Sequence, residues 1–292
     1  MVQQYQKHGN RWPTLMTPVV VNLGSALSIL LLCLHLMLFL RSNKNRNLHH
    51  KNMASLCVAL IFSYIIIIVD TTWVKSKFCY LYVLATFYSN MASAFWMLTI
   101  AFTIWKKVHS TMTKIANQNQ MCSTFFLHSL RNWILPAVIN AILFFFLPFF
   151  SEDSDIDNDF AFEKFNQTEC RFQQSDDMVK FVIVFYGLIF VVNVYFFSSS
   201  VRYIISTKMA VKKNKCDENE DDLAEQFQLY RKLSLVMGLT WMLEMIMSVR
   251  EGYDVLDSTF KILNSLEGCF IAVAFTSSKE AIHFLKSFVV VK

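Results

Sequence analysis

Two acidic residues lie inside otherwise apolar stretches of the chain. Glu244 lies within residues 233–249, and Glu267 lies within residues 262–275. An ionised carboxylate is costly in an apolar medium, so such a residue usually faces a bundle interior or a polar cavity. Each acid is therefore a candidate for a polar network or a ligand contact. For Glu244 an equal alternative remains, which is a position near a helix end where the carboxylate reaches water.

No arrangement of residues indicates an enzyme. The chain has no G-x-S-x-G, H-E-x-x-H, P-loop or C-x-x-C sequence, and its paired carboxylates occur only in acidic loops. The adjacent His49 and His50 have no accompanying Cys/His cluster. The sequence therefore predicts neither a metal site nor a cofactor. His35, alone on an apolar face, is expected to be a packing residue.

The composition indicates a membrane protein. Of the 292 residues, 54% are apolar and only 17% are charged, whereas soluble domains carry about 25% charged residues. Residues 19–40 form 22 positions without a single Asp, Glu, Lys or Arg. About 20 apolar residues in a helix cross a hydrocarbon core of ~30 Å. A soluble enzyme and a nucleic-acid-binding protein are thereby excluded, and the net charge of +5 does not argue for nucleic acid.

Seven apolar segments are candidate membrane spans. Lipid offers no water to backbone groups, so each span is expected to be a helix. The predicted fold is an all-α membrane protein, a seven-transmembrane helix bundle. The seventh segment reaches spanning length only if its neighbours Phe260 and Ser277 are included. The segments are residues 19–40, 53–69, 78–105, 133–150, 181–201, 233–249 and 262–275.

The distribution of charge predicts the orientation of the bundle. With the N-terminus outside, the outer segments hold 9 Lys and Arg residues and the inner segments hold 18. Enrichment of basic residues on the cytoplasmic side is the general rule for membrane proteins. The outer segment 151–180 also holds nine acidic residues. We therefore expect a plasma-membrane protein with an extracellular N-terminus (1–18), a transmembrane domain (19–275) and a cytoplasmic tail (276–292).

Two features of the outer side carry chemistry. Cys79 lies at the outer end of the third segment, and Cys170 lies in the acidic outer loop, where an oxidising compartment would allow a disulfide. A bridge would hold the loop over the mouth of the bundle, and two unrelated thiols are the alternative. Asn166 begins an Asn-Gln-Thr sequon on the same loop, which predicts glycosylation there.

The inner side offers two further surfaces. Apolar residues recur at helical spacing over residues 279–289, and Lys279, Lys286 and Lys292 accompany them. This pattern predicts a short C-terminal amphipathic helix that binds membrane lipids of the inner leaflet. The inner loop 202–232 is either a solvated linker or a surface for a protein partner.

Four short motifs occur at corresponding places in the predicted spans and the first inner loop. They are LVMGLTW at 235–241 followed by Glu244, NSLEG at 264–268, FTIW at 102–105 and RNLHH at 46–50. These motifs are similar to the span-six string, N-S-x-Q-G, F-D-I-W and R-N-x-x-H of methuselah-like receptors. Over residues 19–286 the chain thus resembles the transmembrane core of that family, in the secretin/adhesion class (class B) of G-protein-coupled receptors.

The resemblance implies a function and a set of site residues. It implies a receptor that transduces an extracellular ligand signal, from a peptide or a small molecule, to a heterotrimeric G protein. It also implies a Cys79–Cys170 disulfide, because the family bridges its third span to this loop. The implied ligand and activation core is Trp241, Glu244, Asn264 and Glu267, and the implied inner switch is His50 and Gly238.

The chain departs from the family pattern at several positions. Ile100 stands where secretin-class receptors place a Glu, and Phe275 stands where a Tyr is expected. Leu235 replaces a Pro, which leaves Gly238 as the flexible point of the sixth span. About 18 residues precede the first span, where the family carries a Cys-rich ectodomain. The alternatives are a non-signalling or truncated receptor remnant, acting as decoy or dimer partner, and a small membrane transporter.

Overall fold

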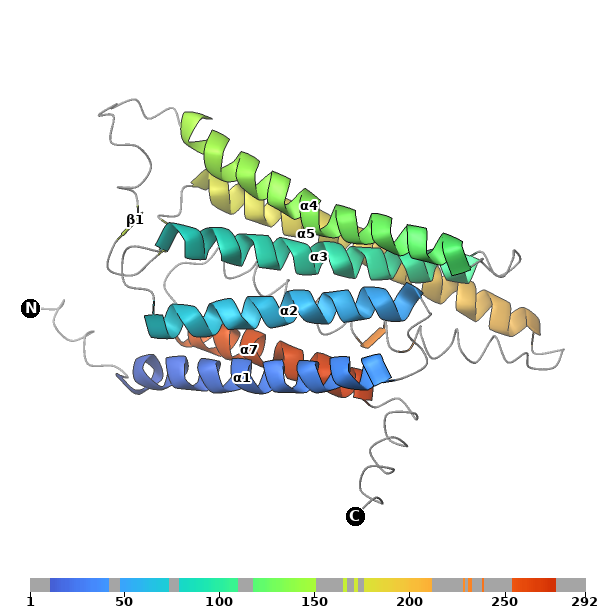
Figure 1. The fold of residues 1–292 in the computed structure, drawn as a ribbon, viewed down its shortest axis with the longest axis horizontal. Coiled ribbons are helices and arrows are strands. Elements are labelled where there is room, and N and C mark those ends of the chain that lie inside the picture. The colour runs from blue at the N-terminus through green and yellow to red at the C-terminus, as the bar shows by residue number, and fades with distance from the viewer. Residues whose placement is uncertain are drawn as a thin grey trace, which may run out of the picture.

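A computed structural model of the chain describes most of the predicted spans. The parts that it describes are residues 11–41, 48–73, 79–109, 118–150, 165–166, 171–172, 176–211 and 254–276, together with 228, 231–232 and 238. Within these parts the chain forms six helices and one two-stranded sheet (Figure 1). The predicted helical membrane fold is confirmed, whereas the short sheet was not predicted. The predicted sixth span lies outside the described residues except at Gly238.

The helices run back and forth through the molecule (Figure 1). They are α1 (Arg11–Arg41), α2 (Leu48–Trp73), α3 (Cys79–His109), α4 (Gln118–Phe150), α5 (Asp176–Val211) and α7 (Asp254–Thr276). Helix α1 packs against α7 and α2, and α3 packs against α2, α4 and α5. In Figure 1, α1 and α7 lie along one side of the bundle and α4 and α5 along the other, with α2 and α3 between them.

Four of these helices contain stretches that are long and apolar enough to cross a membrane. Among the residues that the structure describes, these stretches are Met16–Leu40, Leu48–Val69, Leu84–His109 and Ile183–Tyr203. Their outward faces carry exposed apolar side chains such as Leu23, Leu30 and Leu188. Continuous exposed apolar surface of this kind suits lipid rather than water. The central helix α3 instead buries its large side chains, and Trp96 and Ile100 are fully enclosed.

The helices extend beyond the predicted apolar segments. Helix α4 begins at Gln118 rather than at residue 133, and α5 continues to Val211. Residues 118–132 and 202–211, which the prediction placed between the apolar spans, are therefore helical. Neither stretch contains Gly or Pro, the two residues that interrupt helices most strongly. A helix can also continue into water once it leaves the lipid, so hydropathy alone does not mark its end.

Helix α7 differs from its prediction in the same way. The apolar segment 262–275 was expected to be too short to span alone, yet α7 runs over 23 residues from Asp254 to Thr276. Its first two turns carry Asp254, Asp257 and Lys261, which suit a helix end in a polar environment. Helix α7 is therefore longer than the predicted apolar segment because polar residues extend its N-terminal end.

A short antiparallel pair of strands lies between α4 and α5 in the sequence. Strand β1 is Phe165–Asn166 and strand β2 is Arg171–Phe172, with Phe165 opposite Phe172 and Asn166 opposite Arg171. Strand β2 contacts α3. The predicted outer loop is therefore folded back, at this point, onto the helix that begins with Cys79.

Candidate functional site

Helices α1 and α7 pack closely against each other near the middle of α1, and we call this contact the α1–α7 junction. The Ser28 hydroxyl donates to the carbonyl oxygen of Ser265 at 2.7 Å, and the backbone N–H of Cys269 donates to the Ser28 oxygen at 3.2 Å. Ser28 is fully buried. A buried hydroxyl that both donates and accepts in this way fixes the rotation of the two helices relative to each other.

Glycines allow the close approach at this junction. A Cβ on Gly268 would lie 2.7 Å from Ser28 Cβ and 2.7 Å from Tyr64 Cε2, and a Cβ on Gly24 would collide with the Ser265 hydroxyl. Small residues of this kind let helix backbones approach each other in membranes. Because Tyr64 belongs to α2, Gly268 lies where three helices meet.

Two of the predicted core residues lie beside this junction. The Tyr64 hydroxyl, almost fully buried, donates to the carbonyl oxygen of Asn264 at 3.5 Å. Glu267 is 5% exposed, which agrees with the expectation that this acid faces the bundle interior. Asn264 and Glu267 are three residues apart, so they lie on neighbouring positions of one face of α7. Their partners in the predicted core, Trp241 and Glu244, lie outside the described residues.

The predicted inner switch residues lie apart from this core. The His50 ring is half-buried, with its centroid 6.4 Å from the Phe39 ring of α1 and 5.6 Å from the His49 ring. His49, which no motif singled out, is the more buried of the two histidines. At Gly238 an added Cβ would meet, within the described part of the chain, Phe190 at an ordinary contact distance of 3.8 Å.

A polar network that the sequence motifs did not reveal joins α2, α3 and α4. The Thr99 hydroxyl donates to Asn132 Oδ1 at 3.1 Å and accepts from Asn132 Nδ2 at 2.9 Å. The two side chains thus form a reciprocal pair of hydrogen bonds. Arg131 Nη2 donates to the Thr99 oxygen at 2.6 Å. One turn along α3, Thr103 accepts from Asn52 Nδ2 at 3.4 Å. The spacing of Thr99 and Thr103 in an apolar segment was the one signal for this network.

Two basic side chains, Arg131 of α4 and Lys106 of α3, lie near His128 beside this network. Burial, and then the positive charges of Arg131 and Lys106, lower the pKa of His128 below its ordinary value. His128 is therefore neutral at physiological pH, and the local charge comes from Arg131 and Lys106. Within the residues that the structure describes, no three metal-binding side chains come together.

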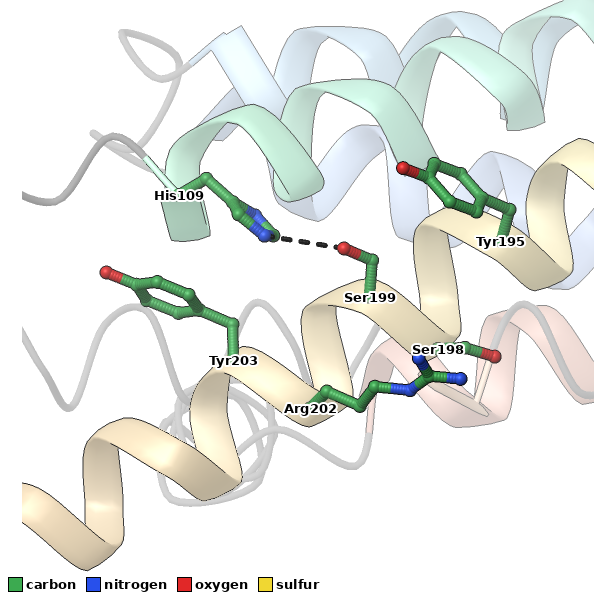
Figure 2. A pocket seen from close by; sticks show the side chains of 6 residues that line it. All are labelled: His109, Tyr195, Ser198, Ser199, Arg202 and Tyr203. Carbon is green, nitrogen blue, oxygen red and sulfur yellow. Dashed lines mark hydrogen bonds between the residues drawn. The ribbon is translucent and has the colours of Figure 1, made fainter.

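A pocket opens between the C-terminal ends of α3 and α5 (Figure 2). It has a volume of about 460 Å³ and is lined by His109, Tyr195, Ser198, Ser199, Arg202 and Tyr203. The Ser199 hydroxyl joins the two helices, because Trp105 Nε1 donates to it at 3.1 Å and His109 Nε2 lies 3.4 Å from it. None of these lining residues belongs to the predicted site.

The predicted disulfide and glycosylation positions lie at or next to the start of α3 and the two short strands. Cys79 is the first residue of α3, and Cys170 immediately precedes β2, the strand that contacts α3. Cys170 itself lies outside the described residues. Asn166 is the last residue of β1 and lies opposite Arg171 of β2. The backbone thus brings both predicted features to the same end of the bundle.

Comparison with known proteins identifies the fold family. Residues 13–271 match the family described as "7 transmembrane receptor (Secretin family)". The chain is 23% identical over 247 residues to "Probable G-protein coupled receptor Mth-like 4" of Drosophila melanogaster, covering 82% of this chain and 44% of the relative. It is 23% identical over 277 residues to "G-protein coupled receptor Mth2" of Drosophila yakuba, covering 88% of this chain and 49% of the relative.

A third relative extends the pattern. "Probable G-protein coupled receptor Mth-like 11" of Drosophila melanogaster is 24% identical over 217 residues, covering 71% of this chain and 40% of the relative. The chain thus spans less than half the length of these three relatives. The match to the receptor family covers nearly all the described helices. The chain therefore belongs to the secretin family of seven-transmembrane receptors, as a methuselah-like member.

Proposed function

We propose that the chain is a G-protein-coupled receptor that transduces an extracellular ligand signal to a heterotrimeric G protein. The observation that carries this proposal is the secretin-family match over residues 13–271. The printed names of the relatives, all G-protein-coupled receptors or probable ones, support the same function. The proposed location is the plasma membrane.

The proposed topology has seven spans with the N-terminus outside. The six described helices and the apolar segment 233–249 would supply the seven spans. The twofold excess of basic residues in the inner segments supports this orientation. Residues 1–18 would be extracellular, residues 19–275 would form the transmembrane domain, and residues 276–292 would form a cytoplasmic tail with an amphipathic helix.

The proposed ligand site lies in the outer mouth of the bundle, under the loop 151–180. A Cys79–Cys170 disulfide would hold this loop in place, and a glycan on Asn166 would mark its extracellular side. The contact of β2 with α3 supports this arrangement, because it brings the backbone beside Cys170 against the helix that Cys79 begins. The ligand is expected to be a peptide or a small molecule.

The proposed transduction step is a movement of the sixth span. Trp241 and Glu244 would face Asn264 and Glu267 on α7, so that ligand binding changes how the two helices pack. Gly238 would be the flexible point, since of the residues that the structure describes only Phe190 approaches the position of its missing side chain. A ligand shifts this equilibrium only by its different affinity for the two states. The inner ends of the helices would then open to the G protein.

Agonist-independent G-protein activation in transfected cells tests this function. Wild type is expected to activate at least one Gα class, and Trp241→Ala is expected to reduce that activity several-fold at equal surface expression. Phe270→Ala is the matched control, because this aromatic side chain is half exposed on α7 and faces outward. Surface-localised wild type without activation of any Gα class would contradict the proposal.

One observation favours a second candidate, a non-signalling receptor. Ile100 is fully buried in the core formed around α3, at the position where the family pattern has a Glu. An apolar side chain there cannot hydrogen-bond to an inner polar switch. A decoy or dimer partner would reach the cell surface and fail the same activation assay. If an Ile100→Glu variant gained G-protein activation, the apolar side chain at position 100 would be the cause of the missing activity.

A further inference from the structure

One face of α5 changes from apolar to polar toward its C-terminal end. Its residues follow one another at steps of three or four, so they form one outward stripe. The apolar residues of the stripe are 59–63% exposed, and the polar residues continue it at the end next to His109. In order, the stripe consists of Val184, Leu188, Val191, Tyr195, Ser198 and Arg202.

The polar end of this stripe forms one wall of the α3–α5 pocket (Figure 2). The opposite wall is the last turn of α3 with His109, whose ring lies 4.8 Å from the ring of Tyr203. Figure 2 shows the Arg202 side chain running along α5 beside Ser198. The pocket therefore opens on the outward side of α5, where the rest of the stripe faces lipid.

The pocket offers groups that bind anions. The hydroxyls of Ser198, Ser199, Tyr195 and Tyr203 can donate hydrogen bonds, and the Arg202 guanidinium can bind a phosphate through two parallel N–H groups. The last turn of α3 also carries Lys106 and Lys107, both exposed, which do not line the pocket itself.

No acidic residue opposes this charge within the two described helices. Helix α3 contains no Asp or Glu at all, and α5 has acidic residues only at its other end, at Asp176 and Asp177. The volume of about 460 Å³ is typical of small-molecule sites and far exceeds a bare phosphate.

We propose that this pocket binds the phosphorylated headgroup of an anionic membrane phospholipid, whose acyl chains lie along the apolar part of the α5 stripe. The continuity of pocket and stripe favours a lipid over a soluble anion, because one molecule would satisfy both surfaces. Basic pockets between helices at the cytoplasmic boundary are suited to such headgroups. Assignment to the inner leaflet rests on the proposed orientation, whereas the binding itself does not.

Lipid binding to the purified full chain tests the proposal. The chain is reconstituted in nanodiscs of phosphatidylcholine containing a rising fraction of phosphatidylinositol 4-phosphate with a fluorescent acyl chain. We expect saturable binding of one lipid per chain. Arg202→Gln is expected to weaken binding about fivefold, since one basic residue near an anionic headgroup contributes about that factor. Ser198→Ala is expected to weaken it less.

The matched control is Arg231→Gln, which removes the same charge from another exposed arginine of the segment 202–232. It is expected to leave binding unchanged, and the melting temperatures of all variants are checked for intact folding. Equal weakening by Arg202→Gln and Arg231→Gln would indicate diffuse attraction and overturn the proposal. So would binding that Arg202→Gln leaves intact.

Two further outcomes would also contradict a lipid site. Soluble inositol phosphate that competes as strongly as the whole lipid would indicate a pocket for a free anion. Equal binding of fluorescent phosphatidylcholine would indicate that only the apolar stripe is recognised. Both leaflets of the nanodisc have the same composition and no G protein is present. Failure of this test is therefore distinct from failure of the receptor function or of the orientation.

Discussion

The junction of α1, α2 and α7 allows a quantitative prediction for Gly268→Ala. The added methyl group would lie 2.7 Å from both Ser28 Cβ and Tyr64 Cε2, whereas non-bonded carbons prefer about 3.5–4.0 Å. The two neighbours belong to different helices, so a shift of α7 away from one does not relieve the other. Overpacking of this kind costs about 1–3 kcal/mol.

Two further contributions enter the balance. Displacement of Ser28 weakens its hydrogen bonds to Ser265 and Cys269, each of which contributes about 1 kcal/mol. Replacing Gly by Ala within a helix, by itself, stabilises the folded state by about 0.5–1 kcal/mol, because Ala loses less backbone entropy on folding. The net expectation for Gly268→Ala is a loss of about 1–3 kcal/mol in the free energy of unfolding, seen as a fall of several degrees in melting temperature.

The measurement is a thermal melt of detergent-solubilised protein followed by size-exclusion chromatography. Gly238→Ala is the matched control, because among the described residues its added methyl group would meet Phe190 alone, at 3.8 Å. This variant is expected to melt at or slightly above the temperature of wild type. If Gly268→Ala melted as high as wild type or higher, the close packing of α1 and α2 on α7 would be refuted.

Three further predictions concern other contacts. Asn132→Ala removes the reciprocal hydrogen bonds with Thr99 and should lower the free energy of unfolding by about 1–3 kcal/mol. The control is Leu130→Ala, an exposed position on the same helix, which should change the free energy of unfolding little. Equal melting temperatures of the two variants would contradict a structural role for the Thr99–Asn132 pair. Trp105→Phe keeps an aromatic side chain, although a smaller one, and loses the indole N–H that donates to Ser199. A loss of at least about 1 kcal/mol is therefore expected in the same melt, and an unchanged melting temperature would contradict it. Asn166→Gln should increase mobility on a gel to that of enzymatically deglycosylated wild type, and unchanged mobility would remove the support for an extracellular loop.

The helical fold could be predicted from the sequence because lipid imposes a simple rule. An apolar run with no charges over residues 19–40 has no other stable structure in a membrane. The positions at which the helices end could not be predicted in this way, because they do not coincide with the ends of the apolar segments. Outside the lipid, α4 and α5 continue because nothing interrupts them, and no hydropathy pattern records how far a helix extends into water.

The candidate sites were predictable only in part. Burial of Glu267 followed from its apolar surroundings, because a carboxylate seldom faces lipid. The Thr99–Asn132 pair did not follow, since its partners lie 33 residues apart on two helices. Whether they meet depends on the rotation of α3 and α4, which packing determines. The α3–α5 pocket escaped notice for the same reason, because its serines and tyrosines are common residues until two helix ends bring them together.

The bond between Ser28 and Ser265 also has a consequence for biogenesis. The two residues are 237 positions apart, and chains are synthesised at about 5–20 residues per second. The first helix therefore enters the membrane roughly 10–50 seconds before its principal partner exists. During that interval Gly24 and Ser28 face lipid or an insertion chaperone. A nascent chain that stops before α7 would leave the Ser28 hydroxyl and the groove at Gly24 uncovered. This uncovered polar group is a feature by which quality control could distinguish incomplete chains from complete ones.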